Sequence, residues 1–555
     1  MKFMKLGSLP DTSYTEDNIR TLDTFVPTDL TVYINNTTYH LHKYALLPKC
    51  GILKDAFLEG GESSSHCIEL HDVPGGEEAF ELCFRFCYGI QIHISAENFV
   101  LAYCAAKFLQ MTEVQEKGNF VKKLESFFKL FVLEGWKDSI LALQSTLKLP
   151  DYADEVGITR RCIDSIVDKI LVPPPKVTWS FTYSRHGYER RQHVVPIDWW
   201  TEDLSNLDLE LFRSVIDSIK STNMLSPQLI GEALHMYASF NLLPKTANSR
   251  TPESSNSHSD RSIKRKKQML EAITILIPHD RGSVSIGFLF KLMILAHHLD
   301  LSSSMKAELT RRCSAQLEDA TVDDLLLVSS SSKDQEFYDI ELVQAMLENY
   351  LTIWRRIYAS QTEDKPSLIR SIQKVGKLID SFLQVAAGDA NMPVSDFISL
   401  ANSLPRIARS NHDELYKAIN IYLKEHPNIP KEDKRSLCSI LDCENLSHDV
   451  TAHAVKNELL PLRTVVQVLF FEQEKAANSK LPNELSKLDL RSPSDQRESA
   501  SETKSTNKSA SDHCSDLPGL VGEIRSRKDV GNDSQISTPR RKFCLSDAVK
   551  KILHR

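Results

Sequence analysis

The stretch DLTVYINNTTYHLHKYALL, residues 29–47, decides the fold of the first part of this chain. Residues 30–34 alternate apolar and polar side chains, which predicts a strand with one buried face. Asn35-Asn36 can adopt the positive φ angles of a tight hairpin turn, so a return strand is expected at 37–41. Residues 43–47 then predict a short helix. The segment is therefore expected to form a β-hairpin followed at once by a helix.

The next block, CIELHDVPGGEEAFELCFRFCYG at 67–89, predicts a strand, a Pro-Gly-Gly turn and an amphipathic helix. Phe80, Cys83, Phe84 and Cys87 recur at three- and four-residue intervals, which makes one apolar stripe. The hairpin, the short helix and this block together resemble a BTB/POZ domain, a homodimerising interaction module. The wording DVPGGEEAFEL…FCYG is similar to that of the plant BTB proteins with an NPH (non-phototropic hypocotyl three) domain, the root-phototropism-like family.

The second half of the chain is predicted to be helical. From residue 197 to about 476 nearly every segment has helical period, as in Leu207, Leu211, Val215 and Ile219. The resemblance to the NPH family continues here in several blocks. The most specific are HDELYKAINIYLKEHP (412–427) and LPLRTVVQVLFFEQ (460–473).

These readings give a domain plan. The fold class is an α+β BTB/POZ domain followed by an all-α helical NPH domain and a disordered C-terminal tail. The expected segments are an N-terminal segment (1–27), a BTB/POZ domain (28–131), a helical extension and Pro-rich linker (132–196), an NPH domain (197–476) with a disordered insertion at about 245–262, and a disordered tail (477–555) with a terminal basic amphipathic segment.

Three local expectations accompany this plan. The polar N-terminal segment is expected to be only partly ordered. Ser95 is expected to cap a buried helix that begins at Ala96. The prolines of Val172-Pro173-Pro174-Pro175 stop helix formation, so the boundary between the two domains is expected near them.

Composition bounds the class of protein. Apolar residues make up 41% and charged residues 25% of 555 residues, as in soluble globular proteins with more than one core. The net charge of −7, from 67 basic and 74 acidic residues, gives no overall attraction to nucleic acid, and no nucleic-acid partner is expected. Eleven scattered cysteines, with no apolar run long enough for a signal peptide or a membrane span, indicate free thiols in the cytoplasm.

No motif predicts catalysis, and we expect no catalytic residue, no cofactor, no metal and no enzymatic activity. Cys438, Cys443, His448 and His453 stand at five-residue intervals. Such steps rotate by about 140° on a helix and do not form one face for zinc. GSVSIG at 282–287 has the glycine spacing of a phosphate loop but lacks the following Lys-Ser or Lys-Thr.

Two features of the helical region have both a functional and a structural interpretation. RSIKRKK at 261–267 is either a nuclear localisation or phosphate-binding cluster, or the solvated start of a helix. Tyr416 matches a position at which NPH domains are thought to be tyrosine-phosphorylated, so the resemblance makes it a candidate phosphorylation site. Its spacing to Ile419 and Leu423 favours packing instead. The structural interpretation is preferred for both features.

The last sixteen residues, RRKFCLSDAVKKILHR (540–555), combine an apolar stripe with six Arg or Lys residues. A basic amphipathic helix of this kind suits an anionic membrane surface or a partner groove, and an inert tail is the alternative. Ser546 is a candidate phosphorylation site, because phosphate there would weaken attraction to anionic lipid. The candidate membrane or partner contacts are Arg540, Arg541, Lys542, Lys550 and Lys551.

The family resemblance implies a function. It implies a substrate-recruiting adaptor of a cullin-three RING ubiquitin ligase, which dimerises with itself or a related BTB protein, docks the N-terminal domain of cullin three and recruits target proteins. Many cullin-binding BTB domains carry a hydrophobic-x-Glu element in the loop that here reads LEGGESSSH (58–66), where Gly61 takes the apolar position. The alternative is a signalling scaffold at the plasma membrane, of the light or auxin response type. A nuclear location is less favoured, since it rests on residues 261–267 alone.

Overall fold

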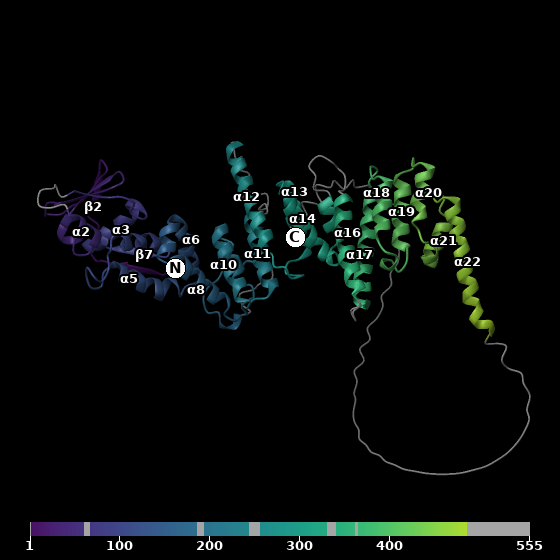
Figure 1. Cartoon of the computed structure of the whole chain (residues 1–555), viewed down its shortest axis with the longest axis horizontal. Coiled ribbons are helices and arrows are strands. Elements are labelled where there is room, and N and C mark those ends of the chain that lie inside the picture. Colours follow the sequence, from purple (N-terminus) through teal and green to yellow (C-terminus); the bar gives the residue numbers. More distant parts are fainter. Residues whose placement is uncertain are drawn as a thin grey trace, which may run out of the picture. The chain divides into compact units, whose positions relative to one another are not determined.

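The structure is a computed structural model that describes residues 2–59, 67–185, 194–242, 256–329, 340–360 and 365–485 (Figure 1). It divides into two compact units, residues 1–441 and 442–555. The first unit begins with strands and short helices, drawn in purple in Figure 1, and continues as helices. The predicted fold class is confirmed: a region with strands and helices precedes an all-helical region.

The hairpin predicted at residues 29–47 is present. Strands β4 (Leu30–Ile34) and β5 (Thr37–Leu41) pair antiparallel, with Val32 opposite Tyr39. Asn35 has a φ of 50° and makes the turn, and helix α1 (Lys43–Leu46) follows. Strand β6 (Cys67–Leu70) runs parallel to β4, which places it at the edge of the sheet.

The expectation of a partly ordered N-terminal segment is wrong. Strand β1 (Phe3–Leu6) pairs antiparallel with β7 (Ile92–Ser95). Strands β2 (Ser13–Glu16) and β3 (Ile19–Leu22) extend the main sheet to the order β2-β3-β5-β4-β6. These strands are only four residues long and contain one buried residue, Leu22, so they lack the alternation of buried and exposed side chains that marks a strand in the sequence. Backbone hydrogen bonds to distant strands hold β1 and β3, whereas β2 pairs with its neighbour β3.

Three helices complete the BTB core. They are α2 (Gly51–Glu59), α3 (Gly76–Tyr88) and α4 (Phe99–Phe108). The predicted apolar stripe of α3 is buried in full. The prediction that Ser95 caps the next helix is wrong: Ser95 ends β7, its N–H donates to Asn98 Oδ1 at 2.9 Å, and Asn98 is the residue that precedes α4.

Short helices extend the BTB core. They are α5 (Phe120–Phe127), the π-helical turn η1 (Phe128–Val132), α6 (Trp136–Ser145), the 3-10 turn η2 (Thr146–Lys148), α7 (Pro150–Glu155), α8 (Ile158–Ile170) and the 3-10 turn η3 (Pro174–Lys176). Glu125 of α5 receives hydrogen bonds from Tyr103 Oη at 3.0 Å and Arg161 Nη2 at 2.9 Å. This contact joins α4, α5 and α8.

The expected boundary near 172–175 does not separate two compact bodies. Trp136 of α6 donates from Nε1 to Asp203 Oδ2 at 2.7 Å, and its ring meets the Trp199 ring edge-on at 4.6 Å between centroids. Trp136 and Trp199 are each 1% exposed. The BTB extension and the start of the helical region therefore share one buried contact within the first unit.

The helical region of the first unit contains twelve helices among the described residues. They are α9 (Thr201–Leu204), α10 (Leu209–Thr222), α11 (Pro227–Asn241), α12 (Asn256–Leu276), α13 (Ile286–His298), α14 (Ser303–Ala315), α15 (Val322–Ser329), α16 (Ile340–Ala359), α17 (Lys365–Ala386), α18 (Val394–Ser403), α19 (Asp413–Glu425) and α20 (Lys431–Ser439), with 3-10 turns η5 (Leu317–Asp319) and η6 (Arg406–Ala408). Ser226 and Ser285 cap α11 and α13 by accepting from Leu229 N and Phe288 N. Helix α12 begins at Asn256, so the predicted insertion at 245–262 is too long at its C-terminal end.

The second unit contains the 3-10 turn η7 (Cys443–Asn445), α21 (His448–Val455) and α22 (Leu462–Leu485). Ser447 caps α21 by accepting from Val450 N. The predicted tail and its terminal segment lie outside the described residues beyond Leu485. Among the described helices, none combines the length and the apolar character that a membrane crossing requires.

Candidate functional site

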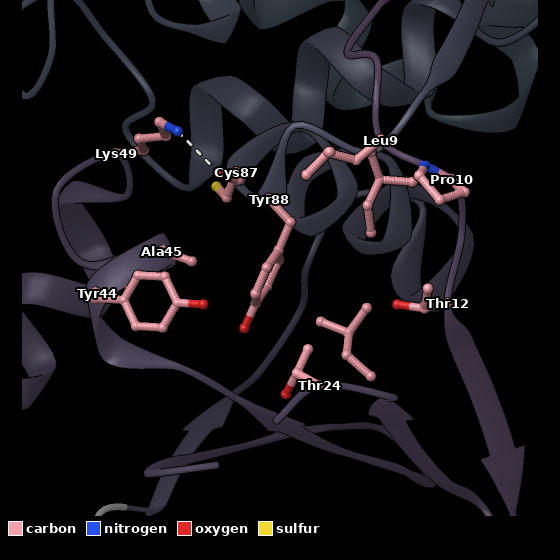
Figure 2. Close-up of a pocket in the computed structure, with 11 residues that line it drawn as sticks. Leu9, Pro10, Thr12, Thr24, Tyr44, Ala45, Lys49, Cys87 and Tyr88 are labelled. Carbon is pink, nitrogen blue, oxygen red and sulfur yellow. Dashed lines mark hydrogen bonds between the residues drawn. The ribbon is translucent and has the colours of Figure 1, made fainter. Parts of the chain in front are cut away.

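A cavity of about 520 Å³ lies beside the hairpin, between the N-terminal segment and helices α1 and α3. Figure 2 shows the Tyr88 ring in the middle of its lining, with Tyr44 on one side and Leu9 and Thr12 on the other. His42 N donates to Tyr88 Oη at 2.7 Å, and His42 Nδ1 lies 2.9 Å from the same oxygen. Burial raises the pKa of Tyr88, so the phenol stays protonated and serves as a structural hydrogen-bonding group.

Two thiols near this cavity, those of Cys50 and Cys83, have raised pKa values. Cys50 Sγ and Cys87 Sγ lie 3.8 Å apart, and Cys83 is fully buried nearby on α3. The contact with Cys87 and burial raise the pKa of the Cys50 thiol, while burial raises that of Cys83. A thiol with a raised pKa remains protonated near pH 7 and attacks electrophiles poorly. Lys49 Nζ donates a hydrogen bond to the Cys87 carbonyl oxygen at 2.8 Å (Figure 2).

The loop that the sequence relates to cullin binding begins at the end of α2. Leu58 is 67% exposed, and Gly61 lies outside the described residues. Lys43 Nζ stands 4.7 Å from the centroid of the Phe57 ring, which ties the end of α2 to α1. Leu58 is therefore an exposed apolar side chain on the BTB surface next to the loop in question.

Tyr416 lies on α19 and is 3% exposed. Its neighbours on the same stripe, Ile419 and Leu423, are also buried, at 0% and 3% exposure. This burial agrees with the packing interpretation. The adjacent turn of α19 is tied to α17, because Gln384 Nε2 donates to Glu414 Oε2 at 2.8 Å. Phosphorylation of Tyr416 stays a prediction, and it requires the helix to open first.

A buried ion pair fixes α17 against the segment before α19. Arg409 donates from Nη2 to Asp380 Oδ1 at 2.7 Å and from Nε to Oδ2 at 3.0 Å. Its Nη1 donates to the Ala401 carbonyl at 2.9 Å. The two side chains are 8% and 4% exposed. Gly376 permits this approach, since a Cβ there would stand 2.3 Å from the Ala408 carbonyl oxygen. No sequence motif announced this pair.

The other residues that the sequence singled out do not converge. The basic cluster at 261–267 lies on the exposed start of α12, where Arg265 is 3.5 Å from Asp208 and Lys267 donates to the Asp300 carbonyl at 2.6 Å. Cys438 and Cys443 are buried, and His448 pairs with Glu472 at 3.0 Å. Within the described ranges no group of three His, Cys, Asp or Glu side chains could hold a metal.

Two further segments that the sequence singled out, 282–287 and 540–555, need a separate statement. Ser285 of the segment 282–287 is a helix cap, as described above. The terminal residues Arg540, Arg541, Lys542, Ser546, Lys550 and Lys551 lie outside the described part of the chain.

Helix α22 in the second unit carries an exposed apolar stripe. Leu462, Val466, Leu469 and Phe470 are 79%, 55%, 40% and 61% exposed, and they recur at positions i, i+4, i+7 and i+8. This stripe lies in the block LPLRTVVQVLFFEQ, which the sequence marked as specific to the family. A contiguous apolar face of this kind indicates a protein-contact surface.

Comparison with known proteins agrees with the fold. The model of the NPH3 family matches residues 198–451, and that of the BTB/POZ domain matches residues 21–123. BTB/POZ domain-containing protein At5g47800 of Arabidopsis thaliana is 53% identical over 486 residues, which cover 86% of each chain. Phototropic-responsive NPH3 family protein NPY1 and root phototropism protein 3, both of Arabidopsis thaliana, are 34% and 32% identical; the alignments cover 86% and 82% of this chain and 83% and 75% of theirs. No solved structure matches.

Proposed function

The chain belongs to the NPH3 family of BTB/POZ proteins, and from this premise we propose that it is a substrate-recruiting adaptor of a cullin-three RING ubiquitin ligase. A BTB adaptor or signalling role follows from the domains themselves; docking to the N-terminal domain of cullin three and ubiquitination of targets are the proposed refinement. The adaptor performs no chemistry. It holds a target near the ubiquitin-loaded enzyme, which raises the effective concentration of the target's lysines.

One observation carries the proposal: the BTB region and the helical region share a buried contact. Trp136 and Asp203 join the extension of the BTB domain to the first helices of the NPH region at 2.7 Å. A target bound to those helices would thus be held at a fixed distance from a cullin bound to the BTB domain. The exposed stripe on α22 supplies a further apolar surface on which a target can dock.

The test is calorimetric titration of the full chain with the N-terminal domain of cullin three, with light scattering to determine whether the chain dimerises. Leu58→Asp alters an exposed apolar residue, the first of the loop at 58–66, and should weaken binding by about tenfold or more. Met224→Asp is the matched control, because Met224 is 70% exposed and lies in the helical region, just after the C-cap of α10. A folded dimer that releases no heat with cullin three would refute the ligase proposal.

A signalling scaffold at the plasma membrane is the second candidate, favoured by the basic amphipathic pattern of residues 540–555. Its test is cosedimentation of the full chain with vesicles of phosphatidylserine and phosphatidylcholine. Deletion of 540–555 should abolish cosedimentation, and a phosphomimetic Ser546→Asp should weaken it. Equal cosedimentation of the full and truncated chains would remove the argument for membrane attachment.

A further inference from the structure

Helix α22 of the second unit is held along one side only. Thr464 and Val468 are 5% and 1% exposed, and Lys475 Nζ donates to the Leu446 carbonyl oxygen at 3.1 Å. Successive residues of a helix are rotated by about 100°, so the exposed stripe of α22 lies on the side opposite Thr464 and Val468. A helix with apolar residues around its circumference is generally buried. The stripe therefore calls for a partner.

The terminal segment 540–555 has the same apolar spacing as this stripe. Its apolar residues recur at positions i, i+4, i+7 and i+8, which are the intervals of the stripe on α22. They are Leu545, Val549, Ile552 and Leu553. A helix of only about four turns is close to the limit of stability in water by itself, so the segment gains by packing its apolar face on another helix. The two stripes are therefore matched in length and in period.

The charges of the two elements are opposite. The segment has six Arg or Lys residues and one carboxylate, Asp547. Residues 442–475 of the second unit have six carboxylates and three Lys or Arg residues. The carboxylates are those of Asp442, Glu444, Asp449, Glu458, Glu472 and Glu474, and the basic residues are Lys456, Arg463 and Lys475. An acidic unit attracts a basic segment and favours its docking over that of an acidic one.

The chain between the two elements is long enough to join them. Residues 486–539, 54 in number, follow α22 and precede the segment. For the disordered tail that the sequence predicts, this length gives a root-mean-square span of about 40 Å. The way back along α22 from Leu485 to Val466 is about 29 Å, at about 1.5 Å per residue. A tether of this length holds the segment at an effective concentration of a few mM, on the order expected for flexible linkers.

We propose that residues 540–555 dock as an amphipathic helix on the exposed stripe of α22 in the same chain. The apolar face of the segment covers the stripe, and its Arg and Lys side chains lie toward the carboxylates of the second unit. A target or a membrane then competes with this contact, because it would use the stripe or the segment itself. The contact does not rest on the ligase role, since neither element belongs to the BTB domain.

The test measures binding of a fluorescently labelled peptide 540–555 by fluorescence anisotropy. A chain that ends at residue 539 should bind this peptide, whereas the full chain should bind it about tenfold more weakly or less, because its own tethered segment occupies the stripe. A scrambled peptide of the same composition keeps the charge but loses the apolar face. It should bind the shortened chain about tenfold more weakly than the native peptide does.

Substitutions on α22 locate the binding surface. Val466→Ser combined with Leu469→Ser in the shortened chain should lower its affinity for the peptide about tenfold. The matched control is Ile357→Ser combined with Val385→Ser, because these residues are 41% and 43% exposed on α16 and α17 of the first unit. The control should leave the affinity unchanged. The comparison of full and shortened chains needs no substitution, so it decides the proposal even if a variant fails to fold.

Four outcomes would overturn the proposal. The first is a dissociation constant above about 10 mM for the shortened chain, since a tether of a few mM would then leave the stripe mostly open. The second is equal binding of the peptide to the full and shortened chains. The third is a difference between them that disappears on dilution, which would identify the segment of a second copy. The fourth is a peptide that cosediments with phosphatidylserine vesicles but does not bind the shortened chain, which would identify a membrane as its partner.

Discussion

Replacing Asp380 by alanine should destabilise the helical region of the first unit by about 3–5 kcal/mol, the cost of breaking a buried ion pair from one side. The change removes the acceptor of Arg409 Nε and Nη2 and leaves only the Ala401 carbonyl for a guanidinium that is buried with its partner at 8% and 4% exposure. Most of the cost comes from the charge left behind and not from the lost attraction. Asp380→Leu combined with Arg409→Met should therefore recover most of the stability.

Amide hydrogen exchange of α17 and α19 is the appropriate assay, because a chain with two compact units does not melt as a single two-state system. Asp164→Ala is the matched control: it breaks the pair of Arg160 and Asp164, whose side chains are 79% and 53% exposed, and should cost less than about 1 kcal/mol. A loss of protection in Asp380→Ala no larger than in the control would refute the reasoning. So would a double variant as unstable as the single one.

Three further predictions concern acid stability, modification and packing. Burial alone would raise the pKa of Glu125, but hydrogen bonds from its arginine, lysine and tyrosine neighbours outweigh it and lower the pKa to about 2. The stability that Glu125 contributes is therefore present above about pH 4.5 and lost as the pH falls toward 2. In Glu125→Gln, the free energy of unfolding should fall by about 1 kcal/mol less across that pH window, a value that allows for solvent screening. A tyrosine kinase should modify Tyr416 faster as urea opens the helix, and equal rates in native and unfolded chains would contradict its burial. Tyr416→Ala should lower the free energy of unfolding by about 3–5 kcal/mol in chemical denaturation. Gly231→Ala should cost about 1–3 kcal/mol in amide hydrogen exchange of α11, because a Cβ there would lie 1.7 Å from the Ser283 carbonyl oxygen. Gly287→Ala, with only an ordinary contact, should be nearly neutral in the exchange of α13.

The elements that could be predicted are those with strong local patterns. The hairpin at 30–41 and the stripe of α3 follow from periods of two and of three to four residues, and the structure confirms both. Strands β1 and β3 could not be predicted, because their pairing with β7 and β5 is a long-range property that four residues do not encode. The pairing of Asp380 with Arg409, 29 residues away, could not be predicted either, because it is also a long-range contact.

In the candidate site, too, local features could be predicted from the sequence and long-range contacts could not. Family wording identified the BTB and NPH3 domains, but it gave no sign that Trp136 and Asp203 would meet. Trp199 and Trp200 lie close to residue 197, where the NPH domain is predicted to begin. The useful signal in retrospect is a lone tryptophan at the end of one predicted domain and a tryptophan pair at the start of the next, since large aromatics require burial.

The contact between Trp136 and Asp203 can form only after the BTB region and its extension have been synthesised. The ribosome adds about 5–20 residues per second, so the 67 residues that separate the two partners take about 3 to 13 s to make. Throughout that interval the indole N–H of Trp136 lacks its acceptor, Asp203, although the strands of the BTB sheet have already been synthesised. Nascent chains of this protein should therefore offer an apolar, chaperone-binding surface at α6, which disappears once residue 203 has left the ribosome.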